Sequence, residues 1–343
     1  ISDTALNRRR GCLFTIGRGL KWFGIVLVTL IVLGVFYQTI ATELDKGKYA
    51  PRGQLYTVNG HRMHLVCMGE GSSAVILQAG GVAESLWWYR VQNQLAAHTQ
   101  VCAYDRAGLG WSEAATEPRD ALTIVGELHN LLEQAGVPAP YVLAGHSYGA
   151  ILTRIYASQY PQEVTAIVLI DSGLLAPKHF ETQNAFDQWK TSNDLLQAVV
   201  WAMTRTGLMR LLLPGQFQQW GFPPDTIGEL TAVRSPNQVF DTDYAERVPA
   251  MWALTEASAA AENFGDFPLA VLWASNTFAM MQQYPNLAEL SAELATYSSN
   301  SLTQIIEGAD HGSILGNEAY AQEVTDAILD VIASVETDQP LAQ

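Results

Sequence analysis

Short apolar runs alternate with stretches of helical periodicity over most of the chain. The apolar runs are residues 74–78, 101–104, 141–144, 166–170, 269–273 and 302–306. The helical stretches are residues 85–97, 123–135, 148–159, 287–295 and 318–335. Continuous apolar runs are typical of strands buried on both faces, and their alternation with helices predicts a mainly parallel sheet covered on both sides.

Two departures from this alternation divide the chain into a core and an insertion. Residues 54–58 and 62–67 flank Asn59 and Gly60, which form a hairpin turn signal. From 172 to 267 the chain is rich in aromatic residues and leucine but has no strand pattern. We therefore expect an α/β core over 54–171 and 268–336, with a helical cap inserted at 172–267.

Near the N-terminus, residues 22–41 form an uncharged stretch that is long enough to cross a bilayer. A helix rises 1.5 Å per residue, so about 20 residues cross a hydrocarbon core of roughly 30 Å. Trp22 and Tyr37 stand near its ends, where amphipathic rings favour the interface. A signal peptide and a buried core helix are the alternatives. Residues 39–41 match a cleavage site poorly, and the stretch is uncharged on every face, so we expect a transmembrane helix.

The basic residues before this helix predict its orientation. They are Arg8, Arg9, Arg10, Arg18 and Lys21. Because positive charge is enriched on the cytoplasmic side of membrane helices, we expect a cytoplasmic tail over 1–21. The transmembrane helix, a linker over 42–53 and an extracytoplasmic body would follow.

Composition and charge narrow the class of protein. The 343 residues are 48% hydrophobic and 15% charged, which excludes a disordered or fibrous chain. Eight of the 19 basic residues but three of the 34 acidic residues lie up to Arg52, so the remainder carries a formal charge of −20. A body this acidic repels phosphate backbones, and we expect no nucleic-acid partner.

The most informative motif is Gly-His-Ser-Tyr-Gly at residues 145–149, which joins the strand at 141–144 to the helix at 148–159. A strand that turns into a helix within two or three residues strains the central residue and leaves no room for flanking side chains. Ser147 would then stand above the sheet edge, at the positive end of the helix, as a nucleophile. The alternative is a serine in an ordinary tight turn.

A serine nucleophile needs a general base, and His311 is the best placed of the seven histidines. It follows the last expected strand, and loops at the carboxyl ends of parallel strands surround the ligand crevice. Ser147 and His311 both lie on such loops, so we expect them to meet. The alternative is a loop histidine with a structural hydrogen bond. His146 is interpreted as a packing residue, because consecutive residues at a sharp turn point apart.

From about residue 54 to 335 the chain resembles enzymes of the α/β-hydrolase fold. The stretches that carry the resemblance are residues 75–81, 104–112, 145–149, 168–172 and 309–312. The resemblance implies an eight-stranded, mainly parallel sheet with a helical cap. It also implies a catalytic triad in the order nucleophile, acid, histidine, which here is Ser147, Asp171, His311.

The acid of this triad can be assigned in two ways. Many members of the family place it after the strand that follows the cap, but residues 274–277 here are Ala-Ser-Asn-Thr. Other members place it one strand earlier, where Asp171 stands. We expect Asp171 to be the acid, with a purely structural capping role as the alternative and Asn276 as the second candidate. Asp310 is disfavoured because it adjoins His311.

The resemblance also implies an oxyanion hole formed by the N–H groups of Gly81 and Tyr148. Related enzymes often have His-Gly where this chain has Ala79 and Gly80, a change that removes no N–H group. Asp105 and Arg106 are interpreted as scaffold residues that brace the loops around the site. The sequence has no metal-ligand spacing and no phosphate-binding loop, so we expect neither a metal nor a cofactor.

The three cysteines bear on the cellular compartment. Cys12 precedes the anchor and would be reduced or lipid-modified in the cytoplasm. Cys67 and Cys102 lie on strands that are neighbours in the resembled fold. Two buried free thiols are the default expectation for them. A cross-strand disulfide is the alternative, because the predicted topology exposes the body to an oxidising compartment.

The cap composition suggests the substrate class. Its large apolar residues are Phe180, Phe186, Trp189, Trp201, Met203, Leu211, Leu212, Leu213, Phe217, Trp220, Phe222 and Trp252. Most of them must pack the cap onto the sheet, but together they give an apolar wall over Ser147. Together with the expected membrane helix, this wall favours a small apolar acyl substrate. The bond cleaved would be the ester, thioester or amide bond of an uncharged or lipid-like acyl group.

Two functions of different classes remain open. The first is a membrane-anchored serine hydrolase that acts through an acyl-enzyme. The second is an accessory subunit of a larger membrane complex, with partner subunits docked on a hydrolase-like body. Within the resembled family, epoxide hydrolases and dehalogenases use an aspartate at the position of Ser147, which argues against both activities.

Overall fold

The computed structural model describes residues 3–71, 73–172, 183–248, 250, 254, 257, 258, 260–283 and 285–341. Its centre is an eight-stranded sheet with the spatial order β1-β2-β4-β3-β5-β6-β7-β8. The strands are β1 (Gln54–Val58), β2 (His61–Met68), β3 (Ala74–Gln78), β4 (Val101–Tyr104), β5 (Tyr141–His146), β6 (Val164–Ile170), β7 (Leu269–Ala274) and β8 (Ser301–Ile306). Strand β2 is antiparallel to both neighbours, and the other pairs are parallel. The predicted eight-stranded, mainly parallel sheet is confirmed.

The strand register brings several loops to one edge of the sheet. Strands β5 and β6 end side by side, with His146 opposite Ile170. Strands β7 and β8 end with Ala274 opposite Ile306. Because these strands are parallel, the residues that follow them meet at the same edge, where ligands bind in open α/β sheets.

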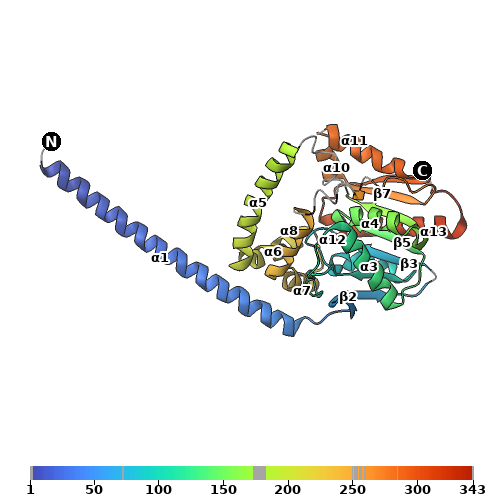
Figure 1. Ribbon diagram of the computed structural model, residues 1–343, viewed down its shortest axis with the longest axis horizontal. Coiled ribbons are helices and arrows are strands. Elements are labelled where there is room, and N and C mark those ends of the chain that lie inside the picture. The colour runs from blue at the N-terminus through green and yellow to red at the C-terminus, as the bar shows by residue number, and fades with distance from the viewer. Residues whose placement is uncertain are drawn as a thin grey trace.

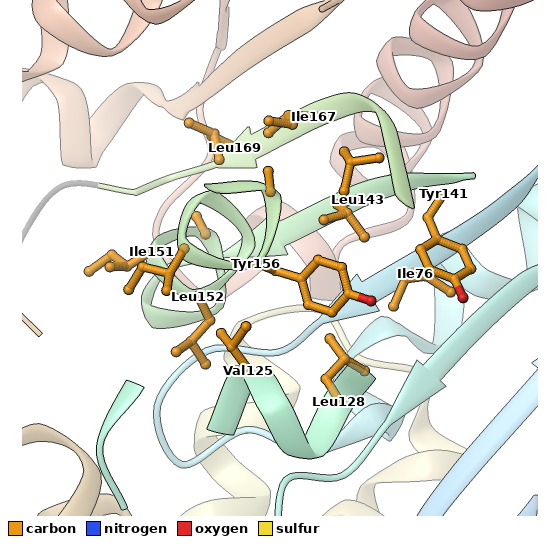
Figure 2. Packing of buried hydrophobic residues seen from close by; sticks show 14 of the residues in the cluster. Ile76, Val125, Leu128, Tyr141, Leu143, Ile151, Leu152, Tyr156, Ile167 and Leu169 are labelled. Atoms are coloured by element: carbon orange, nitrogen blue, oxygen red, sulfur yellow. The ribbon is translucent and has the colours of Figure 1, made fainter. Parts of the chain in front are cut away.

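Helices cover both faces of the sheet (Figure 1). On one face lie α3 (Ala121–Ala135), α4 (Tyr148–Gln159), α10 (Ser275–Met281) and α11 (Pro285–Leu294). On the other lie η1 (Ser85–Trp88), α2 (Tyr89–Leu95), α12 (Ser313–Gly316) and α13 (Glu318–Thr337). Figure 2 shows the first core, in which Leu128 of α3 and Tyr156 of α4 pack towards Leu143 and Ile167 of the sheet.

Two helical elements differ from the sequence-based expectation. The helix expected over 85–97 is a 3₁₀ turn, η1, followed by the short helix α2. Helix α10 begins directly after β7, where the sequence pattern predicts no helix. It has no side-chain N-cap, and seven residues are too few to display a helical period clearly. This helix contributes to the candidate site described below.

Between 183 and 247 the inserted segment consists of helices joined by short turns, and its described residues at 261–267 are not helical. It contains α5 (Gln183–Arg205), α6 (Leu208–Gln219), α7 (Pro224–Arg234) and α8 (Asn237–Arg247). The cap packs onto the core through aromatic residues. Phe217 and Phe222 of the cap contact the ring of Trp87 in η1, which covers one face of the sheet. Phe180 and Trp252, and the side chain of Phe186, lie outside the described residues.

The N-terminal segment is one 46-residue helix, α1 (Asp3–Lys48), which projects from the body in Figure 1. The part of this helix from Arg18 to Lys48 is long and apolar enough to cross a membrane, by length and composition, and most of its residues are exposed. The helix continues through the first seven residues of the expected linker and ends shortly before Pro51. In this part of the helix, Arg210 of the cap hydrogen-bonds Thr42 and pairs with Asp45.

Cys67 and Cys102 form a disulfide, so the default expectation of two free thiols is wrong. The pairing follows from the sheet register. Strands β2 and β4 are antiparallel neighbours, and the two cysteines lie directly opposite each other. Such opposed positions bring side chains close together on one face of the sheet.

Helix α3 offers a matched test of the core. Leu128 is fully buried, whereas Leu122 on the same helix is 51% exposed. We expect Leu128→Ala to lower the free energy of unfolding by about 2–5 kcal/mol, because it removes buried methyl groups and leaves a cavity. Leu122→Ala should change it by less than about 0.5 kcal/mol. Urea denaturation of both variants in detergent micelles measures the difference, and equal losses would contradict this packing.

Candidate active site

The turn between β5 and α4 holds Ser147 in a strained backbone conformation. Its φ and ψ are 55° and −121°, in a region that non-glycine residues rarely adopt. The flanking glycines make this possible, because a Cβ on Gly149 would collide with the carbonyl oxygen of Gln78. The Ser147 N–H donates to the Ile170 carbonyl, 2.9 Å away, and so fixes the turn on the neighbouring strand. The motif therefore lies in the predicted strand–turn–helix context.

His311 lies in the loop after β8 and contacts Ser147. Its Nε2 is 2.9 Å from Ser147 Oγ. The loop is held by Asp310, whose Oδ1 accepts from the N–H groups of Gly312 and Ser313. Asp310 therefore caps its own loop, while the imidazole remains about two-fifths exposed.

Asp171 lies behind the imidazole and is fully buried. Its Oδ2 is 2.6 Å from His311 Nδ1 and also accepts from Thr277 Oγ1 at 2.9 Å. Its Oδ1 accepts from the Ala274 N–H at 3.1 Å. Because a carboxylate only accepts, His311 donates from Nδ1, and Nε2 is left to accept the Ser147 proton. The structure thus brings Ser147, His311 and Asp171 together in a hydrogen-bonded chain.

Helix α10 carries Asn276, the second candidate for the acid position, away from His311. Asn276 on this helix is exposed, and its backbone N–H donates to the Ala309 carbonyl. Thr277, the next residue, is buried and hydrogen-bonds Asp171. Sequence reasoning missed Thr277, because helix α10 is not predicted and a single threonine carries no pattern.

His146 links the serine turn to the histidine loop. Since a carbonyl only accepts, His146 Nε2 donates to the backbone oxygen of His311, at 2.9 Å. The ring is buried, and its Nδ1 has no hydrogen-bond partner among the described residues. Burial, together with the nearby His311, holds the pKa of His146 well below its ordinary value. The sequence predicted only packing for this residue, but it also positions the loop of His311.

Arg106 shapes the glycine loop that follows β3. Its guanidinium donates to the carbonyl oxygens of Ala79 (2.6 Å), Gly80 (2.8 Å) and Gly81. A Cβ on Gly80 would lie 3.2 Å from Ser147 Cβ, so this backbone runs directly beside the serine. Tyr148 is the first residue of α4, where helix N–H groups have no intrahelical partner. The arrangement supports the interpretation of Arg106 as a scaffold residue.

A buried ionic network joins Arg106 to the cap. Glu246 of α8 pairs with Arg106 at 3.0 Å and with Arg119 at 3.4 Å, and Arg119 pairs with Glu127 at 2.7 Å. All four side chains are buried. Glu246 is a residue that sequence analysis missed, because the cap carries no motif and Glu246 lies 140 positions from Arg106.

The cap surface beside the site is mixed rather than uniformly apolar. Val239 and Phe240 of α8 pack with Leu109 in a small apolar cluster. The polar pair Asp243 and Arg247, with Oδ1 and Nε 2.7 Å apart, also lies here. A Cβ on Gly81 would lie 2.8 Å from Asp243 Oδ1. The expected apolar wall is therefore interrupted by a paired carboxylate and guanidinium.

Two groups of side chains place ligand atoms close enough to hold a metal ion. One is His146, Asp171 and His311, and the other is His61, Glu117 and Glu127. In the first group, the Nδ1–Oδ2 hydrogen bond already joins two of the three residues. In the second, Glu127 already pairs with Arg119. His61 Nε2 and Glu117 Oε2 of this second group have no hydrogen-bond partner among the described residues.

The buried imidazole of His146 predicts a pH dependence of stability. The unfolded chain binds a proton here as the pH falls below about 6.5, whereas the folded chain resists it until the pH is well below that value. The free energy of unfolding should therefore fall with pH, by at most about 1.4 kcal/mol per unit from this group. His146→Gln removes the group, so denaturation midpoints at pH 7 and pH 5.5 should differ less than in the unmodified protein. Parallel slopes would contradict this assignment.

Comparison with known proteins gives a consistent family assignment. Residues 73–318 match the alpha/beta hydrolase fold family. An AB hydrolase superfamily protein of Gibberella zeae is 35% identical over 144 residues, which are 42% of this chain and 41% of that protein. The matched stretches span less than half the length of the curated relatives that head the comparison.

Solved structures agree on the fold. The epoxide hydrolase CorEH aligns with a TM-score of 0.64 and 20% identity, over 82% of this chain and 98% of that one. A thermophilic esterase from Thermogutta terrifontis aligns with a TM-score of 0.60 and 16% identity, also over 82% and 98%. With the strand order, the serine turn and the matched residues taken together, the chain belongs to the α/β-hydrolase family.

Proposed function

We propose that this protein is a membrane-anchored serine hydrolase that cleaves an ester, thioester or amide bond of an apolar acyl substrate. The observation that carries the proposal is the chain of two hydrogen bonds, 2.9 Å from Ser147 Oγ to His311 Nε2 and 2.6 Å from His311 Nδ1 to Asp171. A serine hydroxyl is a weak nucleophile until a positioned base removes its proton, and this geometry supplies such a base.

In the proposed mechanism, His311 takes the Ser147 proton as Oγ attacks the substrate carbonyl. Asp171 holds the imidazole in the required tautomer and stabilises the positive charge that it gains. The N–H groups of Gly81 and Tyr148 bind the oxyanion. His311 then protonates the leaving group and activates the water that releases the acyl group. Each oxyanion donor of this kind contributes about 10²–10³ in kcat.

The type of bond cleaved is inferred from the nucleophile. The structural neighbours include both an epoxide hydrolase and an esterase, and their low identity supports the shared fold alone. Within this family the expected nucleophile of an epoxide hydrolase is an aspartate at the serine turn, where this chain has Ser147. The serine therefore favours acyl transfer over epoxide opening.

Helix α1 is proposed to anchor the protein in a membrane, with the N-terminus in the cytoplasm and the body on the other side. The basic residues before the apolar segment favour this orientation. The disulfide between Cys67 and Cys102 supports it independently, because disulfides persist in oxidising compartments. The substrate is accordingly proposed to be a small apolar acyl compound, available at or near the lipid, and nucleic acid is not a proposed partner.

Active-site labelling separates the proposed hydrolase from an accessory subunit of a membrane complex. A fluorophosphonate probe should label the purified full-length protein at a single site, because the activated Ser147 hydroxyl attacks the phosphorus. Ser147→Ala should abolish the labelling, whereas Ser299→Ala, at an exposed serine, should not. If well-folded protein stays unlabelled and co-purifies with other proteins in fixed ratio, the accessory function is favoured instead.

The role of the acid can be measured on a short water-soluble ester. Asp171→Asn should lower kcat by roughly 10²–10⁴-fold, because an amide can hold the imidazole in the wrong tautomer. Asn276→Ala and Asp310→Asn are matched controls, since Asn276 is exposed and an asparagine at 310 still accepts the two loop N–H groups. Both controls should keep kcat within a few-fold of the unmodified protein. A large loss in Asn276→Ala with a small loss in Asp171→Asn would reverse the assignment.

A further inference from the structure

Exposed apolar side chains are concentrated in one part of the body, the corner between α5 and α6. Among the described residues beyond α1, eleven large hydrophobic side chains are exposed, and seven of them belong to residues 195–212, named here the cap corner. They are Leu195 (71%), Leu196 (61%), Val199 (51%), Trp201 (50%), Leu208 (43%), Leu211 (64%) and Leu212 (53%). The other four, Met68, Leu122, Met280 and Ile305, lie on separate elements. Exposed apolar side chains that gather on one part of a surface, rather than being scattered singly, mark an interaction surface.

The cap corner lies against the apolar part of α1. A Cβ on Gly207 would lie 2.7 Å from the ring of Tyr37, and one on Gly34 would lie 2.6 Å from the carbonyl oxygen of Thr206. Figure 1 shows α6 and the adjoining end of α5 beside α1. Gly34 and Tyr37 both fall within the uncharged stretch 22–41, so the corner meets α1 inside the candidate membrane span.

The depth of this contact can be estimated from helix geometry. Seven residues separate Gly34 from Ala41, the end of the uncharged stretch, which corresponds to about 10 Å along the helix. Amphipathic helices at membrane interfaces bury their apolar face by about 5–10 Å. If residues 22–41 lie in the hydrocarbon core, the turn at residues 206–207, which joins α5 to α6 in the cap corner, lies at a comparable depth.

The polar groups at this joint are satisfied within the protein. Gln38 is 3% exposed and donates to the Ser235 carbonyl at 2.7 Å. Arg210 is 7% exposed, donates to Gln38 Oε1 and Thr42 Oγ1, and pairs with Asp45. Unpaired polar groups are costly at membrane depth, so such internal pairing is what a lipid-facing joint requires.

The remaining charge of the cap corner is also paired. Arg205 pairs with Asp241 of α8 at 2.8 Å and lies 4.0 Å from the Trp201 ring centroid. Residues 195–212 contain no acidic residue and no basic residue other than Arg205 and Arg210. The corner therefore presents leucine, valine and tryptophan side chains outward, without an unpaired charge among them.

We propose that the cap corner is a second membrane contact, which inserts into the bilayer beside α1 and holds the cap against lipid. The proposal rests on the membrane anchoring proposed for α1, but not on the hydrolase activity. The corner is tied to the site through α8, because Gln197 donates to the Phe240 carbonyl at 3.2 Å and Glu246 pairs with Arg106. A lipid-seated cap would thus present the region beside Ser147 to substrates that dissolve in the bilayer.

Depth-dependent quenching tests the insertion directly and needs no catalytic activity. The full-length chain carries Cys12→Ser, and the disulfide protects the other two cysteines from labelling. An environment-sensitive fluorophore is attached at Leu211→Cys, or at Leu122→Cys as a control of similar exposure on the core. In phosphatidylcholine vesicles, lipids brominated in the upper acyl chain should quench the probe at 211 and leave the probe at 122 unchanged. Equal quenching at both positions, or none at 211, would overturn the proposal.

A pair of substrates tests the consequence for activity. Leu211→Ser with Leu212→Ser should lower hydrolysis of a long-chain ester embedded in vesicles by roughly tenfold, because apolar burial in the membrane is lost. Hydrolysis of a short water-soluble ester should be retained, which also shows that the variant folds. Leu122→Ser is the control for both substrates. An equal change on both substrates would contradict a role of the corner in access from lipid. Loss of all activity in the unmodified protein, with quenching at 211 intact, would reject the hydrolase and keep the membrane contact.

Discussion

The arrangement of the site depends on the contacts that the buried guanidinium of Arg106 makes. It donates to three successive carbonyl oxygens of the glycine loop and pairs with Glu246 of the cap. A charge that is fully buried is costly unless it is paired and hydrogen-bonded, and removal of one partner typically costs about 3–5 kcal/mol. Through Arg106 the glycine loop and the cap helix α8 are therefore held to each other, and moving either one would take a partner from this buried charge.

Backbone strain at the sheet edge is a second constraint. Ser147 and Asp171 both have positive φ, at 55° and 47°, and they follow adjacent parallel strands. Such conformations persist only where the surroundings over-determine them. Here, the Ser147 N–H bonds the Ile170 carbonyl, and the Asp171 N–H bonds the Leu272 carbonyl. These two backbone hydrogen bonds hold the residues at the ends of their strands, and both side chains contact His311.

Much of this architecture could be predicted from the sequence, because buried strands are uninterrupted apolar runs whose ends are marked by polar or glycine residues. The positions of Ser147, Asp171 and His311 follow from those strand ends, and the three residues do lie together. Thr277 and Glu246 could not be inferred in the same way, and the disulfide was open only as an alternative. Thr277 depends on a short helix without a cap signal, Glu246 on a partner 140 positions away, and the disulfide on the strand register. Each requires three-dimensional proximity that no local pattern encodes.

The joint between α1 and the cap gives α1 a structural role beyond the proposed tethering. A flexible linker would let the body rotate freely above the lipid, but α1 remains helical to Lys48 and hydrogen-bonds the cap through Gln38 and Thr42. After the helix, Arg52 pairs with Glu229 of α7, so the connecting segment is fixed as well. Because the cap is bound to α1 on one side and to Arg106 on the other, the orientation of the helix in a bilayer would set the orientation of Ser147 relative to that bilayer.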